Sequence, residues 1–304
     1  MTRVRDLDGW PAGALHLAIG VFDGVHIGHR ALIADLVRGA RRVAATAVAA
    51  TFDPLPEVAL GRPAAGSILS TVDERAALLR DAGADAVVVF RFDEEFAAQS
   101  AASFLERLCL GREIRGVVVG PDFRFGRGRE GDVAMLRAYG LRGGFTVNTV
   151  EPVGLDGEVV SSTRVRDALR TGDLTLAERM LARPYSVRGT VQRGAQRGRT
   201  LGYPTINVST SPDKLLPADG IYACWVDVNG QRHRAATSLG VRPTFGEGAR
   251  ALECHLLDFS DDLYGATVAV TFARRLRDEL RFPEARSLIE QIARDVEETR
   301  NALR

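Results

Sequence analysis

Two histidines lie three residues apart in the segment FDGVHIGHRALI, directly after the apolar run Leu15–Val21. If that run is a strand and the following residues start a helix, both imidazoles can point the same way. Gly24 and Gly28 leave room for a phosphate near the backbone, and a helix N-terminus adds positive potential. Two converging donors suit nucleotidyl transfer, because the transferred group gains charge in the transition state. We therefore predict that His26 and His29 bind an α-phosphate, whereas an isolated pair of this kind would more often only cap a helix.

A second candidate phosphate site begins at three hydroxyl residues, Ser161, Ser162 and Thr163. They precede a predicted short helix that ends at Gly172. The hydroxyls can cap this helix or bind phosphate, and Arg164 can reach an oxygen of a triphosphate. Alone, the segment is an ordinary helix start; beside the histidine motif, we favour phosphate binding.

A third motif, RGAQRGRTLGYPTINV, combines a glycine-rich loop with two oxygen-bearing side chains. Thr205 and Asn207 are two residues apart, so on a strand they project to the same face. A hydroxyl and an amide oxygen are suitable ligands for Mg²⁺ that bridges ATP phosphates. The loop is expected to line a phosphate channel with its N–H groups, although a plain glycine-rich hairpin is the simpler reading. The loop residues that we predict to bind nucleotide are Gly194, Gly198, Arg199 and Gly202.

The elements that must position these motifs change in kind along the chain. The first ~180 residues alternate strand-like and amphipathic segments, which favours a parallel sheet covered on both faces. Ligands of such sheets bind at the carboxyl ends of the strands. The expected helices lie near 30–40, 71–82, 100–110 and 131–142, and the expected strands are Leu15–Val21, VAATAVAATF from Val43, Asp85–Phe90, Gly116–Gly120 and Phe145–Val150.

From about Pro184, short alternating runs separated by turn residues take over. This spacing predicts a small antiparallel β-barrel. A closing helix is expected from about Glu284, with one apolar face. The runs are YSVRGTVQR, IYACWVDV, RHRAATSLG, LECHLLDF and TVAVTF, and the helix face comprises Leu288, Ile289, Ile292 and Val296.

The composition excludes several classes of protein. The 304 residues are 45% hydrophobic and 26% charged, with a net charge of +1, so no basic surface for nucleic acid is indicated. The longest apolar run is about half of the ~20 residues that a membrane span needs. Three scattered cysteines indicate a reducing, cytoplasmic setting. Lys214 is the single lysine among 40 basic residues and does not lie in a P-loop pattern. We therefore expect a small-molecule enzyme that handles phosphates without lysine.

Together, FDGVHIGH and SSTRVR resemble the bacterial bifunctional riboflavin kinase/FAD synthetase family. The similarity covers nearly the whole chain, through TFDPLP, GPDFRFGRGREGD, GDLTLAERMLARPY, GRTLGYPTIN, PADGIYA, SLGVRPTFG and LECHLLDFSDDLYG. It implies a Rossmann-like HxGH nucleotidyltransferase domain over residues 1–183. It also implies a small antiparallel β-barrel riboflavin kinase domain with a C-terminal helix over residues 184–304. The activities implied are phosphorylation of riboflavin to FMN and adenylylation of FMN to FAD, with ATP as co-substrate and Mg²⁺ in both steps.

The resemblance also assigns roles to residues. In the first domain it implies nucleotide contacts and catalysis at Gly20, Phe22, Asp23, Gly24, His26, Gly28, His29, Ser162, Thr163 and Arg164, and flavin contacts at Asp122, Phe123 and Phe125. In the second domain, Glu253 matches the catalytic base that accepts the proton of the riboflavin hydroxyl. Arg277, Glu279 and Phe282 match a flavin-contacting segment.

Four positions depart from the common family pattern. Leu55 and Pro121 stand where His and Glu are common, and neither is expected to touch the phosphate chemistry. Ile206 replaces a common Ala and is expected to face the core. Ser238 replaces a common Asn and is the departure with the greatest expected consequence.

Two other functions fit parts of the sequence. One is a flavokinase whose first domain is inactive or uses another nucleotide, and the other is a non-catalytic flavin sensor. A sensor would not need the full set of His26, His29, Arg164, Thr205, Asn207 and Glu253. The letters HIGH also occur in class I aminoacyl-tRNA synthetases, but the lysine-rich second signature of those enzymes cannot come from a chain with one lysine. Homo-oligomerisation stays open.

Overall fold

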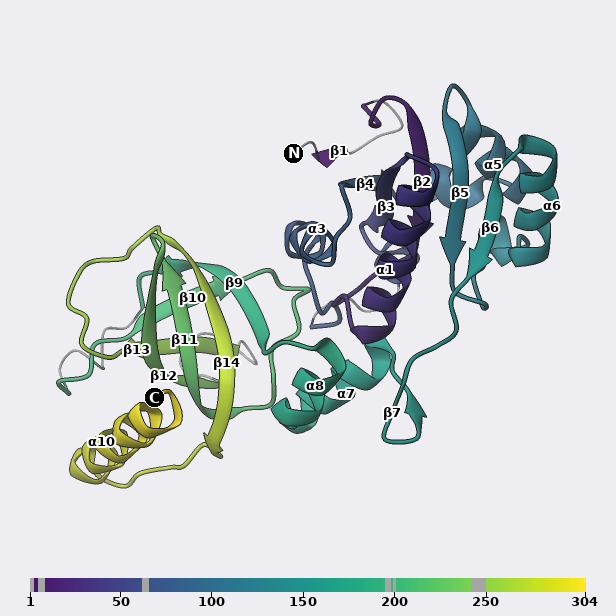
Figure 1. The fold of residues 1–304 in the computed structure, drawn as a ribbon. Helices are drawn as coiled ribbons and strands as arrows, with labels where there is room; N and C mark the ends of the chain where they lie inside the picture. The colour runs from purple at the N-terminus through teal and green to yellow at the C-terminus, as the bar shows by residue number, and fades with distance from the viewer. Residues whose placement is uncertain (1–2, 5–8, 62–65, 195–197, 199–200, 242–249) are drawn as a thin grey trace. The chain divides into compact units, whose positions relative to one another are not determined.

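The computed structural model of the chain describes residues 3–4, 9–61, 66–194, 198, 201–241 and 250–304; Arg199 lies outside them. The chain forms two compact units, Met1–Ser162 and Thr163–Arg304 (Figure 1). The first is built on a parallel sheet and the second on an antiparallel barrel. The predicted fold class, α/β followed by β, is confirmed.

The first unit is organised by a six-stranded sheet in the order β1-β4-β3-β2-β5-β6. Every pairing between its described strands is parallel. Its central strands are apolar on both faces, as a sheet covered by helices on both sides requires. The strands are β1 (Arg3–Val4), β2 (Ala14–Ile19), β3 (Thr46–Asp53), β4 (Ala86–Arg91), β5 (Glu113–Val119) and β6 (Thr146–Thr149).

Helices cover both faces of this sheet (Figure 1). Leu17 of β2 lies in an apolar cluster with Leu105 of α5 and Leu136 of α6, while Ala18 packs with Leu36 of α1 and Leu79 of α3. Alternate residues of one strand thus serve two separate cores. The helices are α1 (Ile27–Arg42), α2 (Pro56–Ala59), α3 (Val72–Asp81), α4 (Glu94–Ala98), α5 (Ala101–Cys109) and α6 (Val133–Gly143), and the smaller elements are a 3₁₀ turn at Arg127–Arg129 and the hairpin β7 (Gly154–Leu155) and β8 (Glu158–Val159).

The second unit contains a closed barrel in the order β10-β13-β12-β11-β14-β9, and β10 pairs with β9 to close it. All of its pairings are antiparallel. Cys224 and Cys254 are fully buried, and burial raises the pKa of Cys254 to about 12. The strands are β9 (Tyr185–Gln192), β10 (Ile206–Thr210), β11 (Gly220–Val228), β12 (Gln231–Val241), β13 (Arg250–Leu256) and β14 (Thr267–Arg277).

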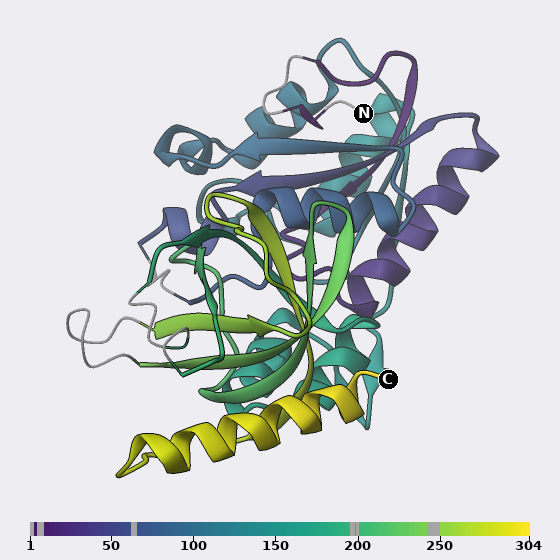
Figure 2. The same cartoon turned by 90° about the vertical axis from the view of Figure 1, so that its left-hand side faces the viewer.

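Among the described residues, three helices of the second unit lie outside the barrel strands. The predicted C-terminal helix is α10 (Ala285–Ala302), which contacts β11, β12 and β14 (Figure 2). The helices α7 (Ser162–Thr171) and α8 (Leu174–Leu181) precede the barrel, and α8 contacts β9 and β14. The backbone N–H of Ala218 also donates to the Leu169 carbonyl at the end of α7, at 2.9 Å. The two helices therefore pack with the barrel, and a domain boundary at residue 183 stays a prediction.

This packing predicts different stabilities for two fragments of the second unit. A fragment that begins at Thr163 should unfold at a higher urea concentration than one that begins at Pro184. The shorter fragment lacks the buried Leu169, Leu174 and Met180, and each such side chain stabilises a fold by about 1.5–3 kcal/mol. Urea unfolding followed by circular dichroism measures the difference. Equal midpoints would show that α7 and α8 add nothing to the barrel.

A buried histidine predicts acid sensitivity of the first unit. His16 on β2 is 3% exposed, and neither ring nitrogen has a hydrogen-bond partner among the described residues. Its ring fits because residues 39 and 116 are glycines; a Cβ there would lie 2.6 Å and 2.2 Å from ring atoms. Burial lowers the pKa of His16, with Asp35 opposing the effect.

Below about pH 6.5, the unfolded chain therefore binds a proton at His16 that the folded chain does not, so the free energy of unfolding falls as the pH falls. We expect His16→Leu to lose less stability than the wild type between pH 7.5 and 5.5. Hydrogen exchange of β2 peptides in the full-length protein measures this. An unchanged pH dependence would assign the acid sensitivity to other groups.

Candidate active sites

The two histidines of the first motif do lie together. His26 ends the turn after β2 and caps α1, where its Nδ1 accepts the backbone N–H of His29 at 3.4 Å. The two rings stack with centroids 3.7 Å apart and planes 20° from parallel. The carboxyl end of a central parallel strand thus presents two adjacent imidazoles, in the place where such sheets bind ligands.

The surroundings of His29 favour its neutral imidazole form. Burial lowers its pKa well below the usual value, and the neighbouring His26 and Arg75 lower it further. The edge of its ring contacts Phe22 at 5.3 Å. A neutral imidazole has one N–H donor and one acceptor, so His29 can donate to a phosphate oxygen without carrying a charge of its own.

The turn that carries the histidines has an unusual backbone. Phe22 and Val25 have φ values of 52° and 43°, a left-handed conformation that branched and bulky side chains rarely adopt. Asp23 holds this turn in place: it is fully buried and accepts the backbone N–H groups of Leu69 and Ser70 at 2.9 Å. The Asp23 carboxylate therefore shapes the turn rather than facing solvent, and its predicted nucleotide contact stays a prediction.

Two residues at this edge were missed by the sequence reasoning. Arg75 of α3 is 1% exposed and donates to the carbonyls of Val21 and Phe52, both at 3.1 Å. Thr51 donates to the Val21 carbonyl at 2.9 Å. The sequence shows a charged residue on the apolar side of the helix VDERAALLRD. Helical spacing alone does not show which groups this arginine contacts. Arg75 fixes the ends of β2 and β3 and adds positive potential near His29.

The hydroxyl motif is linked to the same turn at its first helical residue. The Ser162 hydroxyl donates to the Asp23 carbonyl at 2.9 Å. Thr163 and Arg164 belong to the second unit, so their approach to the phosphate site stays a prediction. The glycines of the first motif pack closely: a Cβ at Gly20 would lie 3.0 Å from the Phe22 ring, and one at Gly28 would lie 3.1 Å from the His26 ring.

The predicted flavin loop GPDFRFG follows β5, which neighbours β2 in the sheet. Asp122 is exposed and Phe123 is half-buried, with its ring stacked 5.5 Å from Phe125. Phe125 itself is buried and packs against Phe104 of α5 at 5.7 Å. Phe125 is therefore a core residue in this structure, and of the two rings Phe123 is the more accessible to a flavin. Of the two departures in this unit, Leu55 is buried and Pro121 is exposed.

The kinase motif comes together on the outer side of the barrel. Glu253 on β13 pairs with Asn207 of β10 on one side and with Ser238 of β12 on the other. The Thr205 hydroxyl lies 3.3 Å from Glu253 Oε2. Leu252 and Cys254, the neighbours of Glu253, are buried, so Glu253 faces outward. Hydroxyl, amide and carboxylate oxygens from three separate segments thus meet at one place.

Two of the described glycines of the loop lie close to the segment that carries Thr205 and Asn207. A Cβ at Gly194 would meet the Asn207 amide at 2.1 Å, and one at Gly198 would meet the Tyr203 carbonyl at 2.3 Å. Gly202 has φ +85° and open space around it, so it serves the backbone conformation. Ile206 pairs with the buried Cys254, as expected for a residue on the core side, although Ile206 is itself half-buried.

The predicted flavin segment of the second unit is tied to helix α10. Arg277 makes two hydrogen bonds to the buried Asp295, at 2.8 Å and 2.6 Å, which occupies the edge of its guanidinium group. The Glu279 carboxylate lies against Gly240, where burial and then Asp219 raise its pKa. Phe282 is half-buried. None of these contacts tests a flavin role, and all three assignments stay predictions.

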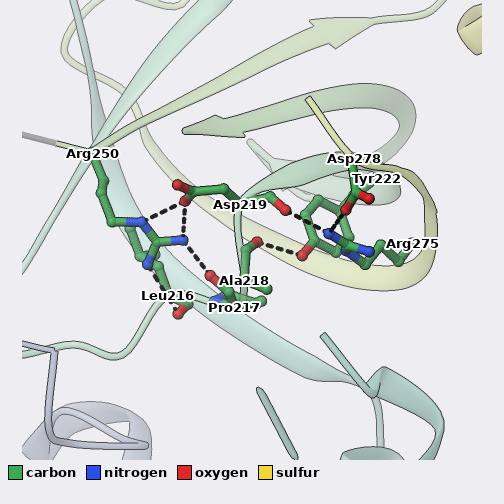
Figure 3. A network of polar contacts seen from close by, with 8 residues as sticks. All are labelled: Leu216, Pro217, Ala218, Asp219, Tyr222, Arg250, Arg275 and Asp278. Atoms are coloured by element: carbon green, nitrogen blue, oxygen red, sulfur yellow. Dashed lines mark hydrogen bonds and ion pairs between the residues drawn. The ribbon is translucent and has the colours of Figure 1, made fainter. Parts of the chain in front are cut away.

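A polar network holds the adjoining PADG loop (Figure 3). Arg250 donates to the Asp219 carboxylate at 2.8 Å and to the Leu216 carbonyl at 3.2 Å. Arg275 donates to the Asp219 carbonyl at 2.7 Å and pairs with Asp278. Two arginines from different strands therefore fix the loop that leads into β11, next to the segment that carries Arg277 and Glu279.

The comparisons with known proteins cover both units. The FAD synthetase family matches residues 12–164, and the riboflavin kinase family matches residues 181–303. Three relatives are named bifunctional riboflavin kinase/FMN adenylyltransferase. The Pseudomonas fluorescens protein is 39% identical over 280 residues, covering 91% of this chain and 89% of its own. The Escherichia coli K12 protein is 37% identical, covering 96% of this chain and 94% of its own. The Bacillus subtilis protein is 32% identical, covering 93% of this chain and 90% of its own.

A solved structure from Streptococcus pneumoniae, described as a macrolide-efflux protein, has the same fold. Its TM-score is 0.88 at 30% identity, covering 99% of this chain and 98% of its own. No helix in the described residues of the present chain has the length and apolar character of a membrane span. Since the two family matches follow one another along the sequence, and the three relatives align over nearly its whole length, this chain belongs to the bifunctional riboflavin kinase/FMN adenylyltransferase family.

Proposed function

We propose that this chain converts riboflavin to FAD in two steps at two separate sites. The barrel transfers the γ-phosphoryl group of ATP to riboflavin and releases ADP and FMN. The first unit transfers AMP from a second ATP to FMN and releases pyrophosphate and FAD. The observation that supports this proposal is that each unit has its own cluster of polar side chains: Glu253 with Thr205 and Asn207 in one, and the stacked His26 and His29 in the other.

In the kinase step, Glu253 acts as the base. The 5′-hydroxyl of riboflavin must lose its proton as its oxygen bonds to the γ-phosphorus, and a carboxylate at this place can accept that proton. The bond between the γ-phosphorus and the bridging oxygen breaks, and ADP leaves. The Thr205 hydroxyl, 3.3 Å from Glu253 Oε2, keeps the carboxylate oriented before substrate binds.

The donor set at this place fits a magnesium ion. Mg²⁺ prefers oxygen ligands and usually takes only a few from the protein, with the rest from phosphates and water. Thr205 and Asn207 supply such oxygens on one face of the barrel. When bound, the ion neutralises phosphate charge. The use of Mg²⁺ by the first unit stays a prediction.

In the adenylyl step, the nucleophile is already an ionised phosphate of FMN, so no base is needed. An oxygen of this phosphate bonds to the α-phosphorus of ATP, and the bond to pyrophosphate breaks. The neutral His29, with His26 stacked on it, donates a hydrogen bond to the α-phosphate as negative charge builds up there. The N-terminus of α1 adds positive potential at the same point.

We also propose that the protein is cytoplasmic, binds no nucleic acid and can form a homo-oligomer. The roles of Arg164, Asp122, Phe123, Arg277, Glu279 and Phe282 are proposed on the family resemblance.

The decisive experiment incubates the full-length protein with riboflavin, ATP and Mg²⁺ and separates the flavins by chromatography. Formation of both FMN and FAD supports the two-step proposal. Accumulation of FMN alone would show a single-activity kinase. Recovery of riboflavin unchanged would show a non-catalytic flavin binder.

We predict that His29→Ala separates the two activities. Phosphorylation of riboflavin should be unchanged, and the rate of FAD formation from FMN should fall by about 10²–10³, the typical effect of removing one preorganised donor. Each rate is measured with its own flavin substrate. Because His29 also stacks on His26, His29→Asn is the matched variant: it keeps an N–H donor and should lose less. A parallel loss of both activities would contradict the assignment of two sites.

We predict the reverse separation for Glu253→Gln. The amide keeps the size of the side chain but cannot accept the proton, so the rate of FMN formation should fall by about 10²–10⁴. Adenylylation of FMN should not change. Thr205→Ala provides the contrast, because it keeps the base and should instead raise the Mg²⁺ or ATP requirement. A wild-type chemical rate for Glu253→Gln would exclude Glu253 as the base.

A further inference from the structure

A histidine beside the kinase site makes a contact that the proposed mechanism does not use. His255 lies two residues after Glu253 on β13, so both side chains project from the same face of the strand. Its Nδ1 is 2.8 Å from the carbonyl oxygen of Pro204, and its ring meets the Tyr203 ring edge-on at 5.4 Å and 80°. His255 thus contacts the two residues that directly precede Thr205.

The segment before β10 needs such a contact because the strand ladder does not extend to it. The pairing of β10 with β13 begins at Ile206, opposite Cys254. Pro204 has no N–H group, so it cannot donate to a ladder. Its carbonyl can only accept, and the imidazole of His255 supplies the donor. This assigns the proton to Nδ1, because a carbonyl oxygen cannot donate.

The same strand therefore holds the segment at two successive points. Glu253 Oε2 accepts from the Thr205 hydroxyl at 3.3 Å, and His255 binds the Pro204 carbonyl. The backbone N–H of Tyr203 donates to the Gly198 carbonyl at 2.8 Å, which connects this segment to the glycine loop. Movement of Pro204 would displace the Thr205 hydroxyl and the described part of the loop together.

We propose that His255 is a positioning residue of the kinase site. By donating from Nδ1 to the Pro204 carbonyl, it fixes the Thr205 hydroxyl where it can serve as a ligand for the Mg²⁺ of ATP. The inference rests on the proposed function of the barrel and adds to it a residue that acts through Thr205. Substitution of a group that orients a metal ligand through a hydrogen bond typically lowers metal affinity or activity by about 10–100-fold.

Two substitutions isolate the hydrogen bond from the ring contact. His255→Phe keeps a ring against Tyr203 and removes the donor. His255→Asn loses the ring but keeps an N–H group near the position of Nδ1. The matched control is His233→Phe, on β12 of the same barrel, where the histidine ring contacts Phe259 at 4.9 Å. All three variants are made in the full-length enzyme.

The first measurement is the Mg²⁺ concentration that gives half-maximal riboflavin phosphorylation. We expect His255→Phe to raise it about tenfold or more, with little change in the KM for riboflavin or in FMN adenylylation. His255→Asn should restore most of the loss, and His233→Phe should match the wild type. The second measurement, independent of turnover, is the hydrogen-exchange protection that Mg·ADP gives to peptides over residues 201–208; His255→Phe should weaken it.

Three results would overturn the inference. In the first, Thr205→Ala raises the Mg²⁺ requirement but His255→Phe does not. In the second, His233→Phe has the same effect as His255→Phe, which would indicate general damage to the barrel. In the third, His255→Asn is no better than His255→Phe, which would show that restoring the N–H donor does not restore the site. Absence of Mg²⁺-dependent riboflavin phosphorylation in the wild type would instead refute the proposed function.

Discussion

Close packing of glycine backbone against polar side chains is a constraint common to both proposed sites. The single lysine, Lys214, is buried, with its Nζ 4.8 Å from the centroid of the Tyr185 ring. In the proposed mechanism, phosphate charge is met instead by imidazoles, a metal ion and the N-terminus of α1. Glycine at 28 leaves room for the His26 ring, and glycine at 194 leaves room for the Asn207 amide. Each proposed site therefore combines polar side chains with a glycine in the adjoining segment.

The sequence indicated much of this because its strongest signals are local. Strand runs, helical spacing and the pair His26 and His29 depend on near neighbours, and the structure confirms the sheet, the barrel and the C-terminal helix. Contacts between distant segments left no such signal. The Asp23 carboxylate accepts the backbone N–H groups of Leu69 and Ser70, which lie 46 or more residues away in the sequence. Arg75 donates to carbonyls at the ends of two strands, which lie 23 or more residues away. Periodicity cannot show which strand a side chain reaches.

Confinement of each group to its own unit separates the two chemistries. The stacked histidines depend on β2, α1 and α3, whereas Glu253 depends on β10, β12 and β13. Strain in the turn at Phe22 and Val25 is balanced by hydrogen bonds within the first unit. In the barrel, strand pairing on both sides of β13 holds the backbone at Glu253. We therefore expect a substitution that displaces the side chains of one site to leave those of the other site in place.

Strand β13 also constrains how this family can change over generations. Leu252, Cys254 and Leu256 face the barrel interior, while Glu253 and His255 alternate with them on the outside. A substitution alters one side chain, but an inserted or deleted residue moves every later side chain of the strand to the opposite face. Such a change would bury a carboxylate and expose the apolar positions. The alternation of buried and outward-facing residues therefore constrains the length of β13 more than the length of the connecting loops.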